Sequence, residues 1–362
     1  MRPMPFTRRL ALRTAGAVFL SPIPSFGAQA DWTPAGPEAA FKICLNAGNR
    51  EDEILRNFKQ IGVDSVVLTG PEIPWTPESL RALMNRFQPL GLSVANLMIV
   101  GFNDVIWGGK EAEAQTDCVV QSIQAAGKVG LPVVEYNFYA HRLTEGYKEE
   151  SGRGGAGYTA YDYERSKNLP PKDGAGKHSR ADQMKRAERF LKAVIPEAEK
   201  ANVRLALHPN DPPVPVSRGS GQIVATFEHW KKYLSLVNSP YNGMTYDCGV
   251  SREMGEDPVA VCRYLGERDR INHVHYRNVV VRKPYVDYTE VFPDTGMVNM
   301  FAVMKELVRQ KYSRGFFPEH PRALDIDRER GLPNASAGGG GFVAEVYNVA
   351  YTKAMLQAAL SA

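Results

Sequence analysis

Short apolar runs alternate with segments of helical periodicity along most of the chain. Runs typical of buried strands lie at residues 41–45, 65–68, 92–99, 132–138, 203–208, 244–247, 273–279 and 315–318. Between and after them, apolar residues recur every three or four positions, which predicts helices near 54–61, 77–90, 111–128, 181–200, 223–236, 258–265, 300–310 and 342–360. This order favours a parallel sheet that closes into a single (β/α)8 TIM barrel.

Two segments break the rhythm of the predicted barrel. Residues 139–177 form a long polar insertion after the fourth strand, and a loop of this length is usually either functional or disordered. A glycine run at 338–341 precedes the last helix, where it could cradle an anion or serve as a hinge. A doubly wound open sheet is the alternative fold, but no G-x-G-x-x-G follows the first strand to support dinucleotide binding.

Residues 1–30 have the pattern of an export signal, which leaves 31–362 as the catalytic barrel. Arg8 and Arg9 form a twin-arginine pair, a short apolar stretch follows, and Ala28-Gln29-Ala30 offers a cleavage site. A general secretory signal or a disordered N-terminus are the alternatives. We therefore expect a periplasmic or secreted protein whose apolar stretch is too short for a membrane span.

The export signal also accounts for the formal charge of +4. It contains four arginines and no acidic residue, so the remainder has equal numbers of basic and acidic side chains. A neutral domain gives no electrostatic reason to expect nucleic acid or an anionic membrane as a partner. We expect a small sugar or sugar acid as the ligand, and a homo-oligomer is compatible with the sequence.

Polar side chains gather at the ends of the last four predicted strands, where barrel enzymes place their active sites. These ends contain His208, then Asp247 with Cys248, then His273 and His275, then Glu319 with His320. Four of the seven histidines in the chain fall here. Imidazole and carboxylate groups together suit Mn²⁺, Fe²⁺, Co²⁺ or Zn²⁺ better than Mg²⁺ or Ca²⁺, so the pattern predicts a divalent-metal site.

Two details at these strand ends stay open from spacing alone. Asp247 and Cys248 cannot both face the barrel interior, because side chains alternate along a strand. Arg277, two residues beyond His275, could bind a substrate carboxylate or form a salt bridge to a neighbouring acid. The other three cysteines, which lack any metal-site spacing, are expected to be buried free thiols; they are Cys44, Cys118 and Cys262.

The order of several short motifs resembles the D-mannonate dehydratase family, a group of xylose-isomerase-like metal-dependent barrels. The matching pieces, between about residues 120 and 321, are Tyr136-Asn137-Phe138, His208-Pro209-Asn210-Asp211-Pro212-Pro213, Asn242-Gly243-Met244-Thr245, His275-Tyr276-Arg277-Asn278-Val279, Gly296-Met297-Val298-Asn299-Met300 and Pro318-Glu319-His320. The resemblance implies a lyase that removes water from a sugar acid to give a 2-keto-3-deoxy acid.

The resemblance also implies roles for individual residues. It makes His208, Asp247, His275 and Glu319 the metal ligands, with Asp247 in place of a family cysteine and Glu319 in place of an aspartate. This oxygen-rich set favours manganese. His320 corresponds to the family's base. No clear counterpart is found for a family tyrosine in the last loop.

Substrate contacts are expected from five further residues, namely Arg277, Asn210, Tyr136, Asn137 and His273. Candidates for the acid that assists the departing hydroxyl are Tyr136, Tyr139, His141 and His273. A metal-dependent sugar isomerase or epimerase would use the same kind of site and is the alternative activity. Other metal-dependent chemistry and simple sugar binding are the remaining readings.

Overall fold

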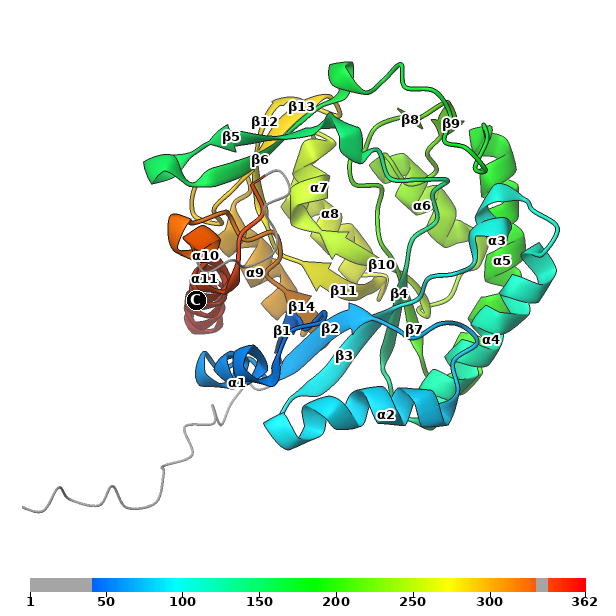
Figure 1. Ribbon diagram of the computed structural model, residues 1–362, viewed down its shortest axis with the longest axis horizontal. Coiled ribbons are helices and arrows are strands. Elements are labelled where there is room, and N and C mark those ends of the chain that lie inside the picture. Colours follow the sequence, from blue (N-terminus) through cyan, green and yellow to red (C-terminus); the bar gives the residue numbers. More distant parts are fainter. Residues whose placement is uncertain (1–40, 330–337) are drawn as a thin grey trace, which may run out of the picture. The chain divides into compact units, whose positions relative to one another are not determined.

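A closed barrel of eight parallel strands forms the centre of the protein (Figure 1). The computed structural model describes residues 41–329 and 338–362, so the predicted export signal lies outside the described residues. Around the barrel the strands follow in the order β1 (Lys42–Asn46), β14 (Gly315–Phe317), β11 (Ile271–His275), β10 (Asn242–Asp247), β7 (Arg204–Leu207), β4 (Val133–Tyr136), β3 (Ser93–Met98) and β2 (Ser65–Thr69). The predicted (β/α)8 fold is confirmed.

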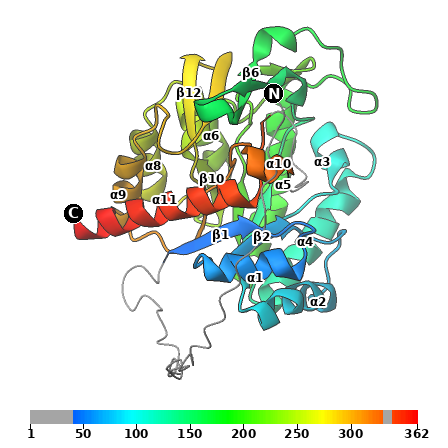
Figure 2. The ribbon, with the colours of Figure 1, turned by 60° about the vertical axis from the view of Figure 1, so that its left-hand side comes forward.

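An outer layer of helices covers the barrel strands, whose apolar residues are therefore buried on both faces. The main helices are α1 (Asp52–Gln60), α2 (Pro77–Phe87), α4 (Ala112–Lys128), α5 (Arg180–Ala201), α6 (Phe227–Leu236), α8 (Pro258–Gly266), α9 (Met300–Arg309) and α11 (Phe342–Ser361). Shorter helices are α3 (Asn103–Trp107), α7 (Cys248–Glu253) and α10 (Asp325–Glu329). Figure 2 shows α11 beside β1, where Phe342 stacks on Phe58 of α1.

Local chemistry fixes where several of these helices begin. The Thr76 hydroxyl accepts a hydrogen bond from the Ser79 N–H, and Pro77 occupies the first helical position of α2. The predicted helix at 223–236 begins four residues later, at Phe227, because the Thr226 side chain caps the His229 N–H. Residues 223–225 are instead buried in the loop that leads to α6.

A second, antiparallel sheet lies at the carboxyl ends of the barrel strands (Figures 1 and 2). Its order is β12 (Asn278–Lys283), β13 (Asp287–Val291), β6 (Gly157–Asp162) and β5 (Tyr147–Ser151). The insertion after β4 thus contains the hairpin of β5 and β6. In the sheet, β6 pairs with β13, which forms a second hairpin with β12. The predicted seventh strand, 273–279, is wrong in extent, because the chain leaves the barrel after His275 and joins this sheet at Asn278.

Two further predictions concern the cysteines and membrane-spanning helices. All four cysteines are free thiols, and three of them are buried, while Cys118 is partly exposed. Within residues 41–329 and 338–362, none of the helices has the length and apolar character needed to cross a membrane. A small hairpin of β8 (Val216–Ser217) and β9 (Ser220–Gly221) completes the strands.

Candidate metal centre and active site

The barrel brings the four predicted ligands together at its mouth. His208 follows β7, Asp247 ends β10 and His275 ends β11, and one ligand atom from each lies within 4.8 Å of the others. Glu319, just after β14, joins them through an Oε1 atom 3.1 Å from His275 Nδ1. Three of the four residues are buried and His208 is half-buried. The predicted assembly of these side chains from four strand ends is therefore what the structure shows.

The unmatched polar atoms of this cluster fit a divalent cation. His208 Nδ1 donates to the Pro209 carbonyl oxygen at 2.8 Å, which leaves its Nε2 lone pair free for a metal. His275 Nδ1 and Glu319 Oε1 are buried without a well-directed hydrogen bond to any described residue. A buried polar atom without a partner is costly, so an ion that binds here would satisfy both atoms.

The charge balance around Arg277 supports the same conclusion. Five carboxylates surround this guanidinium, those of Asp211, Asp247, Glu253, Glu290 and Glu319. Only two other arginines, Arg142 and Arg322, pair with this group among the described residues. If all five carboxylates are ionised and the histidines are neutral, two negative charges remain in excess over the three arginines. A divalent cation would balance them.

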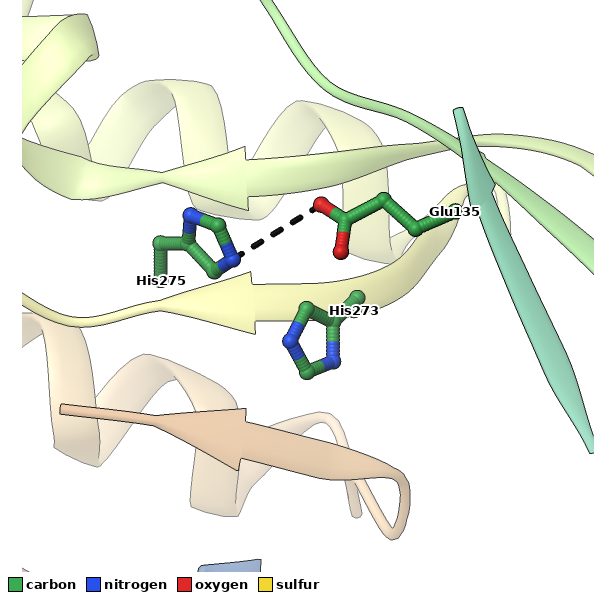
Figure 3. Close-up of side chains that lie close together, drawn as sticks. All are labelled: Glu135, His273 and His275. Atoms are coloured by element: carbon green, nitrogen blue, oxygen red, sulfur yellow. Dashed lines mark ion pairs between the residues drawn. The ribbon is translucent and has the colours of Figure 1, made fainter. Parts of the chain in front are cut away.

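Glu135 is a carboxylate of this centre that the sequence analysis did not select (Figure 3). Its Oε1 lies 3.7 Å from His275 Nε2, and it also forms a compact group with His273 and His275. Hydrogen bonds from Thr245 Oγ1 at 2.6 Å and Asn96 Nδ2 at 2.7 Å hold the carboxylate. The sequence feature that could have identified Glu135 is its position one residue before Tyr136. Because side chains alternate along β4, one of these two must point into the barrel.

His275 lies between the carboxylates of Glu135 and Glu319. Burial alone would lower the pKa of this histidine, but the two carboxylates outweigh burial and raise its pKa to about 9. His273 lies two residues before His275 in β11 and is fully buried. Burial lowers the pKa of His273 to about 4. Its place inside the barrel favours a role beside the metal centre over the predicted contact with substrate.

Two of the predicted substrate contacts, Tyr136 and Asn210, are buried and bond to other residues of the protein. Tyr136 points into the helix layer, where its hydroxyl lies 3.0 Å from that of Tyr233 of α6. Asn210 is fully buried, and its amide bonds to Gln222 and to the Val224 N–H, so it holds the loop after β7. Asn137 follows the end of β4, where its Nδ2 lies 3.7 Å from the Met98 sulfur, and its role in binding substrate stays a prediction.

The structure shows which of the two side chains, Asp247 or Cys248, joins the ligand group. Asp247 lies in the ligand group, and its Oδ1 also accepts the Val250 N–H at the start of α7. The Cys248 thiol instead donates to the Arg277 carbonyl oxygen at 3.2 Å.

Arg277 is 2% exposed, with Nη1 2.6 Å from Glu253 and Nε 3.0 Å from Asp247. This arrangement is the salt-bridge alternative of the sequence analysis.

His320 lies beside the ligand group and is accessible from the cleft. Its Nε2 is 3.5 Å from Glu319 Oε2, and its Nδ1 is 2.9 Å from Glu290 Oε2 of β13. Burial would lower the pKa of His320, but the carboxylates of Glu290 and Glu319 more than offset burial and raise it. The residue also has a left-handed backbone, with φ of 49°.

A cleft of about 1080 Å³ opens over His320 and Glu319. Its walls come from the loop after β1, the insertion after β4, the second sheet and the segment before α11. The glycines at 339–341 line it, but no anion is needed at this helix start. The Asp327 carboxylate already accepts the N–H groups of Gly341, Val343 and Ala344.

Comparisons with known proteins identify the family of this chain. The family model described as D-mannonate dehydratase (UxuA) matches residues 174–361. Mannonate dehydratases from Streptococcus suis and Thermotoga maritima are each 27% identical over 78% of this chain, which covers 86% and 89% of their lengths. The crystal structure of the enzyme from S. suis serotype 2 superposes with a TM-score of 0.80 at 25% identity, covering 89% of this chain and 95% of that one.

More distant structures share the fold. An L-ribulose 3-epimerase superposes with a TM-score of 0.53 at 16% identity, and it covers 88% of this chain. The family model, by contrast, spans more than half of this chain and includes all four predicted ligands and His320. The chain therefore belongs to the D-mannonate dehydratase family.

Proposed function

We propose that this chain is a metal-dependent hydro-lyase that converts a sugar acid such as D-mannonate into a 2-keto-3-deoxy acid. The observation that carries the proposal is the placement of His320, which lines the cleft next to the ligand Glu319. A proton acceptor beside a metal centre is what elimination next to a carboxylate requires. Relatives that are named mannonate dehydratase support the choice of substrate.

In this reaction His320 takes the proton from the carbon atom next to the substrate carboxylate. The electrons of the broken C–H bond form a carbon–carbon double bond, and the hydroxyl on the next carbon leaves, with a proton, as water. The enol that remains becomes the 2-keto acid by moving a proton to carbon. Glu290 stabilises His320 after it gains its proton, because the carboxylate lies 2.9 Å from Nδ1.

The bound cation would supply positive charge beside the substrate oxygens, where negative charge develops as the C–H bond breaks. We propose His208, Asp247, His275 and Glu319 as the residues that hold it, and manganese as the ion. The equal number of carboxylates and imidazoles supports manganese, and elemental analysis of the purified protein identifies the ion directly.

The variant His320→Asn tests the proposed base. It should retain the metal content of the parent and lose turnover of D-mannonate by about 10² to 10⁴-fold, the usual contribution of a general base. His229→Asn, on α6 and outside the cleft, is the matched control and should keep full activity. Full activity of His320→Asn with an intact metal content would remove His320 from the mechanism.

Mass spectrometry of the product tests the reaction itself. Dehydration lowers the product mass by one water molecule, whereas isomerisation or epimerisation leaves the mass unchanged. An unchanged mass would therefore replace the lyase with an isomerase at the same centre. For the location of the enzyme we propose the periplasm or the cell exterior, on the basis of the twin-arginine pattern at residues 1–30.

A further inference from the structure

Arg142, in the insertion after β4, lines the same cleft as Glu319 and His320. Its side chain is 40% exposed. The two other arginines of the cleft are less accessible, since Arg50 is 27% and Arg322 only 1% exposed. Arg142 is therefore the arginine that most readily meets a ligand in this cleft.

The guanidinium of Arg142 is held in place from behind. Its Nε donates to the Asp211 carbonyl oxygen at 2.6 Å, and its Nη2 donates to Asp211 Oδ2 at 2.8 Å. The Tyr147 hydroxyl fixes the other oxygen of Asp211 at 2.7 Å. No described residue accepts a hydrogen bond from Nη1. An arginine that is already immobilised loses little conformational freedom when it binds a ligand.

The charges around the cleft show why an anionic ligand needs this arginine. Glu290 and Glu319 both line the cleft and would repel a carboxylate. Arg50 cannot offset them, because both of its terminal nitrogens bond to Glu345, at 2.5 and 2.6 Å. Arg322 is buried against Glu290 at 2.9 Å. Of the cleft's arginines, Arg142 alone combines an exposed face with a free terminal nitrogen among the described residues.

We propose that Arg142 binds the carboxylate of the substrate and so makes the enzyme select sugar acids over neutral sugars. This inference rests on the proposed function, since it names how that site recognises its substrate. Nη1 donates to the carboxylate, while Asp211 keeps the guanidinium oriented toward the cleft. A charged hydrogen bond of this kind accounts for about a 10- to 100-fold difference in affinity.

The test compares two ligands that differ only at the acid group. Binding of D-gluconate and of D-glucitol to the metal-loaded protein is measured by isothermal titration for the parent, Arg142→Gln and Arg142→Lys. We expect Arg142→Gln to weaken D-gluconate binding about 10- to 100-fold and to leave D-glucitol binding unchanged. Arg142→Lys, which keeps the charge, should recover part of the loss.

Arg218→Gln is the matched control. Arg218 also pairs with a carboxylate, that of Glu145, and with the backbone oxygen of Pro170, but it does not line the cleft. It should bind D-gluconate like the parent. Equal weakening of both ligands in Arg142→Gln, or no weakening of either, would overturn the proposal.

Turnover separates this inference from the proposed reaction. If the parent binds D-gluconate through Arg142 but does not dehydrate D-mannonate, the carboxylate site stands and the proposed function fails. If the parent dehydrates D-mannonate and Arg142→Gln keeps the parent KM, the function stands and the role of Arg142 fails. Metal content and melting temperature, measured for each variant, show whether the fold is retained.

Discussion

Replacing Arg277 with methionine tests whether this arginine is structural or binds substrate. The substitution removes a buried guanidinium whose nitrogens lie 2.6 Å from Glu253, 3.0 Å from Asp247 and 3.2 Å from Glu319. Removing one partner from a buried ion pair leaves an uncompensated charge and typically costs about 3–5 kcal/mol. With Asp247 and Glu253 left without a basic partner, we expect the free energy of unfolding to fall by at least about 3 kcal/mol.

The loss of stability in Arg277→Met should also depend on pH, and the structure indicates the direction of this dependence. Burial raises the pKa of Glu253 well above its usual value, and it raises the pKa of Asp247, even with Arg277 present. Without Arg277 both values rise further, so the folded variant binds more protons than the unfolded chain. The variant therefore keeps its stability at a pH below the pKa values that these two carboxyls have in the unfolded chain. It loses stability as the pH rises through the higher pKa values that they have in the folded variant.

Urea unfolding of the metal-depleted protein, at pH 5 and pH 8, measures both effects. The destabilisation of Arg277→Met should be larger at pH 8. Arg282→Met is the control, because Arg282 forms an exposed pair with Asp287 at 43% and 34% exposure, worth about 1 kcal/mol or less. If Arg277→Met is as stable as the parent and only raises the KM for D-mannonate, the structural role is refuted and substrate binding is favoured.

Two further substitutions test the support of the metal and the start of α11. Glu135→Gln should lower the affinity for the divalent metal about 10- to 100-fold, because its carboxylate faces His275 Nε2 at 3.7 Å. Competition with a chelator measures this, and an unchanged affinity would exclude Glu135 from the centre. Asp327→Ala should lower the free energy of unfolding by about 1–2 kcal/mol, because three N–H groups at the start of α11 lose their acceptor. Denaturant unfolding checks this against the exposed Asp325→Ala, and equal stability of the two would contradict it.

The barrel and its ligand group could be predicted from the sequence because both depend on local patterns. Alternating strands and helices define the parallel barrel, and a parallel barrel places all strand ends at one mouth. His208, Asp247, His275 and Glu319 therefore had to meet once their strands were assigned. The ends of the elements were less predictable, as at residues 276–279, which stay buried although the chain has changed sheets.

The direction of individual side chains was harder to predict, since it depends on the phase of each strand. At the end of β4, Glu135 faces the barrel and Tyr136 faces the helices, whereas the sequence analysis selected Tyr136 and not Glu135. Asn210 has the chemistry of a substrate ligand, but its amide is used by Gln222 and Val224. Such pairings come from residues distant along the chain, which a strand-end pattern cannot reveal.

The second sheet explains why the surroundings of His320 depend on tertiary structure. Glu290, the partner of His320 Nδ1, belongs to β13, which pairs with β6 from the insertion after β4. The same insertion contributes Arg142 to the cleft wall. The barrel thus supplies the proposed metal ligands, whereas the added sheet and the insertion supply the partner of the proposed base and the arginine that we propose for substrate binding. Because loops beyond the strands can change while a barrel persists, a chain with this barrel and a different second sheet could hold the same ion and still act on a different substrate.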